Sequence, residues 1–257
     1  MCPFGGGLVD GAEGWLCAGH MVCHCLLVET NFGLVLVDTG LGRTDVERPL
    51  ERLGRMFVTV LRPKLSLDET ALSQIERLGF SAGDVKHIVP THMDLDHVGG
   101  LSDFPDAEVH VFSTELRAAL DRTTLHERFR YRPAQWSHSP RWRELHEGGD
   151  TWMGLRSIRA IGDEILLVPL IGHSRGHVGV AVRDGDGWLL HAGDAYFHHR
   201  EMDANPACPP ALRLFQSRVA FDDRARLENQ ERLRELARRS DIRVFSAHDA
   251  VELSRFA

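Results

Sequence analysis

Short apolar runs alternate with polar turns along the chain, and the period of the apolar residues separates expected strands from expected helices. Two runs, 22–29 and 33–38, are predicted to be strands that are joined by a turn at 30–33. In residues 68–78 the apolar residues recur at helical spacing instead, and Asp68 is the expected N-cap. The beginning of the chain therefore predicts a strand pair followed by an amphipathic helix.

The rest of the chain continues this alternation. Strands are predicted at 85–89, 109–112, 165–170, 178–183, 188–191 and 242–245, and helices at 114–121 and 223–239. Residues 122–150 are predicted to be irregular, and two interpretations stay open: a lid over a cleft or a long surface loop. With no linker or internal repeat, residues 1–257 are expected to form a single domain of mixed α and β structure.

Composition narrows the class of protein. The formal charge of −7 argues against a nucleic-acid binder, which needs a basic surface. The sequence has neither an apolar run long enough for a membrane span nor a recognisable signal peptide. The five cysteines form no recurring pair, and Cys23 and Cys25 read as small apolar residues of a strand. We therefore expect a cytoplasmic protein with a small-molecule partner; no oligomeric state is indicated.

The segment 91–100 carries the strongest chemical signal. It places His92, Asp94, Asp96 and His97 directly after an apolar run, where unpaired charges are costly. A divalent cation would convert their mutual repulsion into coordination. The alternative is a solvated acidic loop.

Further ligand-type residues follow other apolar runs. Asp38, His173, Asp194 and His248 each stand just beyond such a run. If the runs are neighbouring strands of packed sheets, their ends gather at one rim and can form a multi-ligand metal cleft.

Taken in order, these residues resemble the motifs of the metallo-β-lactamase-fold hydrolases over nearly the whole chain, and the overall length is similar to the lactonase-like branch. The resemblance implies an α/β (α+β) fold, arranged as an αββα sandwich. It also implies two divalent metal ions, with zinc first and manganese or iron as alternatives. By position, one ion would be held by His92, Asp94 and His173, the other by Asp96, His97 and His248, with Asp194 bridging both and Asp38 supporting a ligand or the cluster backbone.

Asp94 departs from the family pattern, which usually has a histidine at this position. A carboxylate can ligate at about the same distance. It adds a negative charge, so three carboxylates and a bridging hydroxide would roughly cancel the charge of two divalent ions. We therefore expect a less acidic bridging water and a site that accepts iron or manganese as well as zinc.

The implied chemistry is attack by a metal-bridging hydroxide on a small ester, lactone or thioester. Asp96 is the expected proton carrier. Related lactonases have a tyrosine where this chain has Phe197, so Tyr196 is a candidate catalytic residue; the alternative is a packed aromatic side chain. Residues 198–200 are basic and would suit an anionic substrate, unless they form a solvated loop.

Other functions stay open. The carboxylate at position 94 also suits an iron-dependent redox enzyme of the same fold. A non-catalytic binding protein with a degenerate metal site is a further hypothesis, although every other ligand position is filled. A nuclease is disfavoured by the acidic charge.

Overall fold

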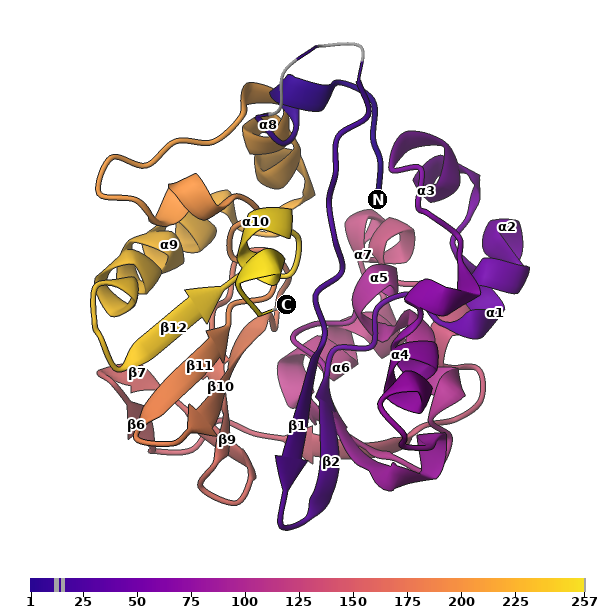
Figure 1. Cartoon of the computed structure of the whole chain (residues 1–257), viewed down its shortest axis with the longest axis vertical. Coiled ribbons are helices and arrows are strands. Elements are labelled where there is room, and N and C mark those ends of the chain that lie inside the picture. Colours follow the sequence, from indigo (N-terminus) through magenta and orange to yellow (C-terminus); the bar gives the residue numbers. More distant parts are fainter. Residues whose placement is uncertain (12–13, 15–16, 257) are drawn as a thin grey trace. The chain divides into compact units, whose positions relative to one another are not determined.

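The computed structural model describes residues 1–11, 14 and 17–256, which form two compact units (Figure 1). The first unit takes residues 1–24 and 146–257, and the second takes 25–145. Each unit has its own five-stranded sheet. The mixed α/β character predicted from the sequence is thus confirmed.

The sheet of the second unit has the order β1-β2-β3-β4-β5. Its strands are β1 (Leu26–Thr30), β2 (Gly33–Val37), β3 (Val85–Val89), β4 (Glu108–Phe112) and β5 (Arg141–Leu145). Strands β1 and β2 form the predicted hairpin, while β2 to β5 pair in parallel. Strand β1 begins later than predicted, so Cys23 and Cys25 precede it.

Short helices connect these strands. They are α1 (Arg43–Glu47), α2 (Pro49–Arg52), α3 (Arg55–Val60), η2 (Leu67–Glu69), α4 (Ala71–Arg77), η3 (Ala82–Asp84), α5 (Leu95–Val98), η4 (Gly99–Asp103), α6 (Ser113–Asp121), α7 (Leu125–Arg130) and η5 (Pro133–Trp136). Thr70 caps α4 in place of Asp68, which lies in η2. Leu72 and Leu116, from α4 and α6, join Ile88 and Val109 of the sheet in one apolar core. This core fixes the strand ends that carry the ligand-type residues.

The sheet of the first unit has the order β12-β11-β10-β9-β8. Its strands are β8 (Ile158–Ile161), β9 (Ile165–Pro169), β10 (Val178–Asp184), β11 (Gly187–His191) and β12 (Ile242–Phe245), beside a small sheet of β6 (Thr151–Trp152) and β7 (Leu155–Arg156). Its helices are η1 (Gly6–Leu8), η6 (His199–Met202), α8 (Pro210–Val219), α9 (Asp223–Ala237), α10 (Ala250–Leu253) and η7 (Ser254–Phe256). Leu233 and Leu236 of α9 pack into the apolar core of this unit.

The segment 122–150 differs from its predicted irregular form. It contains α7, η5 and β5, and β5 pairs with β4 along its whole length. Whether the segment closes over a cleft stays a prediction. Among the described helices, none is long and apolar enough to cross a membrane.

Candidate metal centre

In the second unit, the chain turns from β3 into α5 through residues 90–94, and this turn carries the ligand-type side chains. The imidazole rings of His92 and His97 are buried, with centroids 4.0 Å apart. Nδ1 of His92 lies 3.0 Å from the Thr91 hydroxyl, and its Nε2 lies 3.3 Å from Oδ2 of Asp94. One nitrogen of His92 is thus held by the protein, while the other faces a carboxylate.

Asp38 anchors this turn from the end of β2. Its Oδ1 accepts the amide proton of Thr91 at 2.7 Å, and its Oδ2 lies 2.8 Å from Nδ1 of His97. The Asp38 backbone is left-handed, with φ of 56°, which turns the chain sharply after the strand. A carboxylate that orients one ring nitrogen of histidine leaves the other for a metal ion.

The turn after β2 and the turn at the end of α5 pack backbone to backbone. The amide of Gly100 donates to the Thr39 hydroxyl at 3.0 Å, and the amide of Thr39 donates to the His97 carbonyl at 2.7 Å. A Cβ on Gly100 would lie 2.9 Å from the Thr39 carbonyl oxygen. Glycine is therefore required where the two turns meet.

Asp94 is held by Arg130, at the end of α7. The guanidinium makes two hydrogen bonds, 2.6 Å from Nε to Oδ1 and 2.9 Å from Nη2 to Oδ2. Burial opposes the charged guanidinium, but the Asp94 carboxylate raises the pKa of Arg130 above its ordinary value. Asp94 thus has a cationic partner within the protein, which the sequence analysis did not anticipate.

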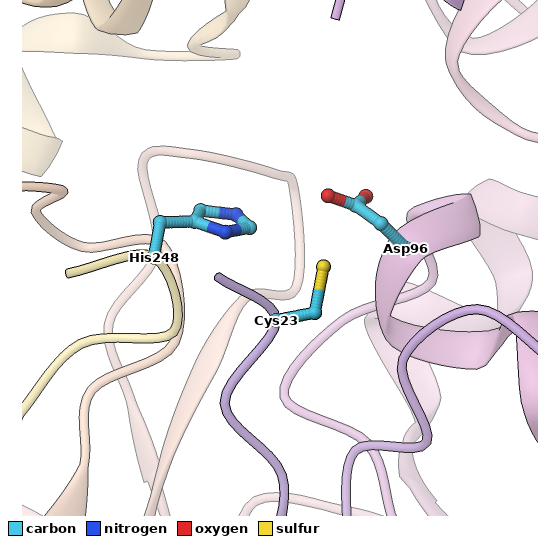
Figure 2. Close-up of side chains that lie close together, drawn as sticks. All are labelled: Cys23, Asp96 and His248. Carbon is cyan, nitrogen blue, oxygen red and sulfur yellow. The ribbon is translucent and has the colours of Figure 1, made fainter. Parts of the chain in front are cut away.

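Asp96 lies in the first turn of α5 and is buried (Figure 2). Helix α5 begins at Leu95, so Asp96 and His97 are consecutive residues of its first turn. The second unit thereby carries four of the predicted ligands within the short segment 92–97.

In the first unit, two predicted ligands from separate loops flank the carboxylate of a third. Nε2 of His173 lies 3.2 Å from Oδ2 of Asp194. Nε2 of His248 lies 3.1 Å from Oδ1 of the same residue. All three side chains are buried. Asp194 thus stands between the two histidines, as a bridging ligand would.

A backbone carbonyl and a further histidine position two of these three residues. Nδ1 of His248 lies 2.7 Å from the carbonyl oxygen of Val22, which orients the ring so that Nε2 faces Asp194. His177 accepts the amide proton of Asp194 at 2.9 Å and donates to the Leu170 carbonyl at 3.0 Å. His177 thus orients the loop of Asp194 from behind.

Tyr196 is fully buried in the core of the first unit. Its hydroxyl donates to Oε1 of Glu252 at 3.0 Å, and burial together with the Glu252 charge raises the pKa of Tyr196 well above its ordinary value. These contacts favour the packed aromatic side chain that the sequence left open. The ring of Phe197, by contrast, lies 5.9 Å from that of His173 and 4.8 Å from that of His248, centroid to centroid.

A cavity of about 280 Å³ lies in the first unit beside His248. It is lined by Val9, Asp10, Gly11, His20, Met21, Phe197, His198, His199, Leu212, His248, Asp249, Ala250 and Val251. His199 is fixed there by Asp249, whose Oδ2 lies 2.9 Å from Nδ1 of the ring. The cavity thus joins an apolar lining to a predicted ligand and to a histidine that a carboxylate orients.

Cys23 also belongs to the first unit and neighbours His248 (Figure 2), with its Sγ within 4.8 Å of a ring nitrogen. It is half-buried and precedes the strand in which the sequence analysis had placed it.

The donor sets suit divalent metal ions. Imidazole and carboxylate are the usual ligands of zinc, and iron and manganese also accept them. His97 and His248 each have one nitrogen oriented by a carboxylate or a carbonyl group, as metal-binding histidines generally do. The residues of each unit therefore fit the metal chemistry that the sequence predicted.

Comparison with known proteins agrees with this donor chemistry. Residues 18–248 match the model of the metallo-beta-lactamase superfamily. The chain belongs to that superfamily. Its fold is accordingly the metallo-β-lactamase fold, as the motifs predicted.

Among its relatives, a probable metallo-hydrolase of Mycobacterium tuberculosis is 44% identical over 89% of this chain and 75% of its own length. An N-acyl homoserine lactonase of Bacillus thuringiensis is 32% identical over 38% of this chain and 39% of its own length. This superfamily member thus has metallo-hydrolase relatives, and a lactonase matches part of it.

Solved structures show the same fold. An N-acyl homoserine lactone hydrolase with the product N-hexanoyl-L-homoserine at its catalytic metal centre has a TM-score of 0.72 and 22% identity; the match covers 99% of this chain and 92% of that one. A dizinc quorum-quenching lactonase has a TM-score of 0.61 and 16% identity, with 89% and 72% covered. At these identities the likeness concerns the fold.

Two residues that support the site were missed from the sequence. They are Arg130, the partner of Asp94, and Glu115, whose Oε1 accepts the amide proton of Met93 at 2.9 Å. An aspartate in place of a histidine at a buried position signals that a cation must be near. Sequence spacing does not say which of the many arginines supplies it.

Proposed function

We propose that this chain is a metal-dependent hydrolase that acts on a small ester, lactone or thioester. The observation that carries the proposal is the arrangement of His173 and His248 around the single carboxylate of Asp194. Two buried histidines that face one buried carboxylate are a donor set that is typical of zinc sites. The superfamily and its metallo-hydrolase relatives support the same conclusion.

Two divalent metal ions are the proposed cofactors, with zinc as the first choice. The proposed ligands are His92, Asp94, Asp96, His97, His173, Asp194 and His248. When bound, the ions supply Lewis-acid activation of water and of the ester carbonyl. Asp38 and Val22 orient His97 and His248 for this task.

Asp96 is the proposed proton carrier to the leaving group. It is buried at the start of α5, where it is shielded from bulk water. A carboxylate within reach of the reacting atoms can accept a proton from water and return it to the departing alkoxide or thiolate.

The cavity beside His248 is the proposed position for the non-reacting part of the substrate. Val9, Met21, Leu212 and Val251 give it an apolar lining, which suits an acyl chain or a similar hydrocarbon group. Its volume of about 280 Å³ suits a small molecule. His199 in the same lining can donate a hydrogen bond to a carbonyl or carboxylate group of the substrate.

The first experiment is to determine the metals in protein purified without added metal or chelator, and then to screen acyl homoserine lactones, simple esters and thioesters for hydrolysis. We expect about two zinc or manganese ions per chain and metal-dependent hydrolysis of at least one class. Predominant iron with oxygen consumption would favour the redox alternative. Absence of metal after reconstitution would contradict the proposal and favour a degenerate site.

A further inference from the structure

Arg130 and Asp94 form a closely matched ion pair in the second unit. The two hydrogen bonds run in parallel from one guanidinium edge to the two carboxylate oxygens, at 2.6 and 2.9 Å. The side chains are only 7% and 18% exposed. A bidentate pair with so little water around it is geometrically specific and strongly coupled.

The same carboxylate also faces a predicted metal ligand. Oδ2 of Asp94 lies 2.9 Å from Nη2 of Arg130 and 3.3 Å from Nε2 of His92. Asp94 therefore stands between a fixed positive charge and the position of a metal ion that His92 would bind. The electrostatic attraction of Asp94 for that ion is therefore reduced, because the positive charge of Arg130 already compensates the carboxylate.

A charge count shows the consequence. Asp94 contributes −1 and Arg130 contributes +1, so the pair is neutral, like the histidine that the superfamily usually has at position 94. In the sequence analysis, an additional negative charge was assigned to the ligand set, because Asp94 was counted without the positive charge of Arg130.

We infer that Arg130 is a positioning residue that neutralises the ligand Asp94, so that the Asp94–Arg130 pair replaces one neutral histidine. This inference rests on the proposed function, because it concerns the metal ions of that site. Arg130, rather than Asp94 alone, then sets the metal affinity and the zinc preference of the centre.

The surrounding residues hold the two partners in register. Oε1 of the buried Glu115 accepts hydrogen bonds from the amide of Met93 at 2.9 Å and from the hydroxyl of Tyr131 at 3.0 Å. Met93 precedes Asp94, and Tyr131 follows Arg130. One carboxylate oxygen thus ties the two neighbouring segments together, and the pair is preset by the fold.

The test compares zinc binding in wild type and R130Q, starting from metal-free full-length protein and using a chromophoric chelator as competitor. Without the guanidinium, the charge of Asp94 is no longer compensated, and a dication is attracted more strongly. We expect R130Q to bind the zinc ion beside Asp94 about tenfold more tightly than wild type. Without metal, R130Q should melt at a lower temperature, because a buried carboxylate has lost its partner.

R128Q is the matched control. Arg128 lies on the same helix and carries the same charge, but its side chain is exposed and its Nε donates to the Arg122 carbonyl. Zinc affinity and melting temperature should both stay close to wild type.

The double variant D94H/R130Q provides a second measurement that does not leave a buried charge. It exchanges the neutral pair for a neutral histidine, and we expect zinc affinity within about threefold of wild type. D94H alone should bind zinc more weakly than the double variant, because the Asp94 carboxylate would no longer compensate the charge of Arg130 beside the ion.

The outcomes separate this inference from the proposed function. Zinc affinity in R130Q equal to or weaker than in wild type, with a lowered melting temperature, would show a purely structural role and overturn the inference. The proposed function would survive that result, because wild type would still bind metal and hydrolyse substrate. A wild-type protein that binds no zinc would refute both.

Discussion

The two units build their ligand sets in different ways. In the second unit, His92, Asp94, Asp96 and His97 come from one turn, and other side chains orient them: the Asp38 carboxylate and the Arg130 guanidinium. In the first unit the predicted ligands come from three loops that are far apart in sequence, and a backbone carbonyl, that of Val22, orients His248. Side-chain support can be removed by one substitution, whereas backbone support persists as long as the fold does.

The largest effect is expected in the first unit, at Asp194, because two of the proposed ligands face this one carboxylate. Asp194→Ala removes the carboxylate that lies between His173 and His248. We expect loss of hydrolysis by at least about a thousandfold and loss of bound metal. Metal analysis and steady-state kinetics would measure both effects.

Asp184→Ala is the matched control for that variant. Asp184 lies in the same unit but is exposed, at the β10–β11 hairpin, where it pairs with Arg243. It should retain metal and activity. A fully active Asp194→Ala enzyme would refute the ligand assignment in the first unit.

An intermediate effect is expected at Asp38, the side-chain support of the second unit. Asp38→Asn keeps the shape but removes the charge that orients His97. Loss of such a partner typically lowers metal affinity about 10- to 100-fold. Competition with a chelator would measure the change, and unchanged affinity would show that the turn holds His97 without Asp38.

One buried histidine in each unit should make stability depend on pH. Burial and the neighbouring His87 lower the pKa of His110 to about 4, and burial and His191 lower the pKa of His24 to about 3. Both residues gain protons more readily when the chain is unfolded. Their contribution to stability is therefore complete above about pH 6.5 and is lost progressively as the pH falls towards 4.

Chemical unfolding between pH 4 and 7 would measure the free energy of unfolding as a function of pH. In His110→Gln this free energy should fall less steeply as the pH is lowered. His146→Gln is the control, because the side chain of His146 is exposed. A pH profile that is identical in wild type and His110→Gln would contradict the assignment for the second unit.

The smallest effect concerns Tyr196. Tyr196→Phe removes only the hydroxyl that donates to Glu252, and we expect a loss of about 1–2 kcal/mol in the free energy of unfolding. The rate of hydrolysis should change less than about twofold, because the hydroxyl is committed to a core contact. A large fall in kcat with little change in stability would instead support a catalytic Tyr196.

The parts of the fold that could be predicted are those in which a local pattern of apolar and polar residues marks a strand or a helix. Strands β3 (Val-Lys-His-Ile-Val) and β12 (Ile-Arg-Val-Phe) are mostly apolar and end at polar turns, so both their type and their ends could be predicted. Strand β5, by contrast, has the sequence Arg-Trp-Arg-Glu-Leu and lies at the edge of its sheet with mostly exposed side chains. Edge strands need little apolar character, so their composition resembles that of a loop.

The proposed ligands could be picked out for a similar reason, because each follows a strand. Their supports could not. Arg130 is 36 positions from Asp94, and Glu115 is 22 positions from Met93. Such pairings depend on how the helices pack against the sheet, and no local pattern of residues predicts that packing.

The division of the chain into units also has a temporal side. Residues 25–145 are contiguous, whereas the first unit unites residues 1–24 with residues 146–257. During synthesis, the second unit is complete while Val22 still lacks its partner His248. One set of predicted ligands is therefore synthesised early and in a single segment, and the other is completed late, when a segment made at the start meets a loop made more than two hundred residues afterwards.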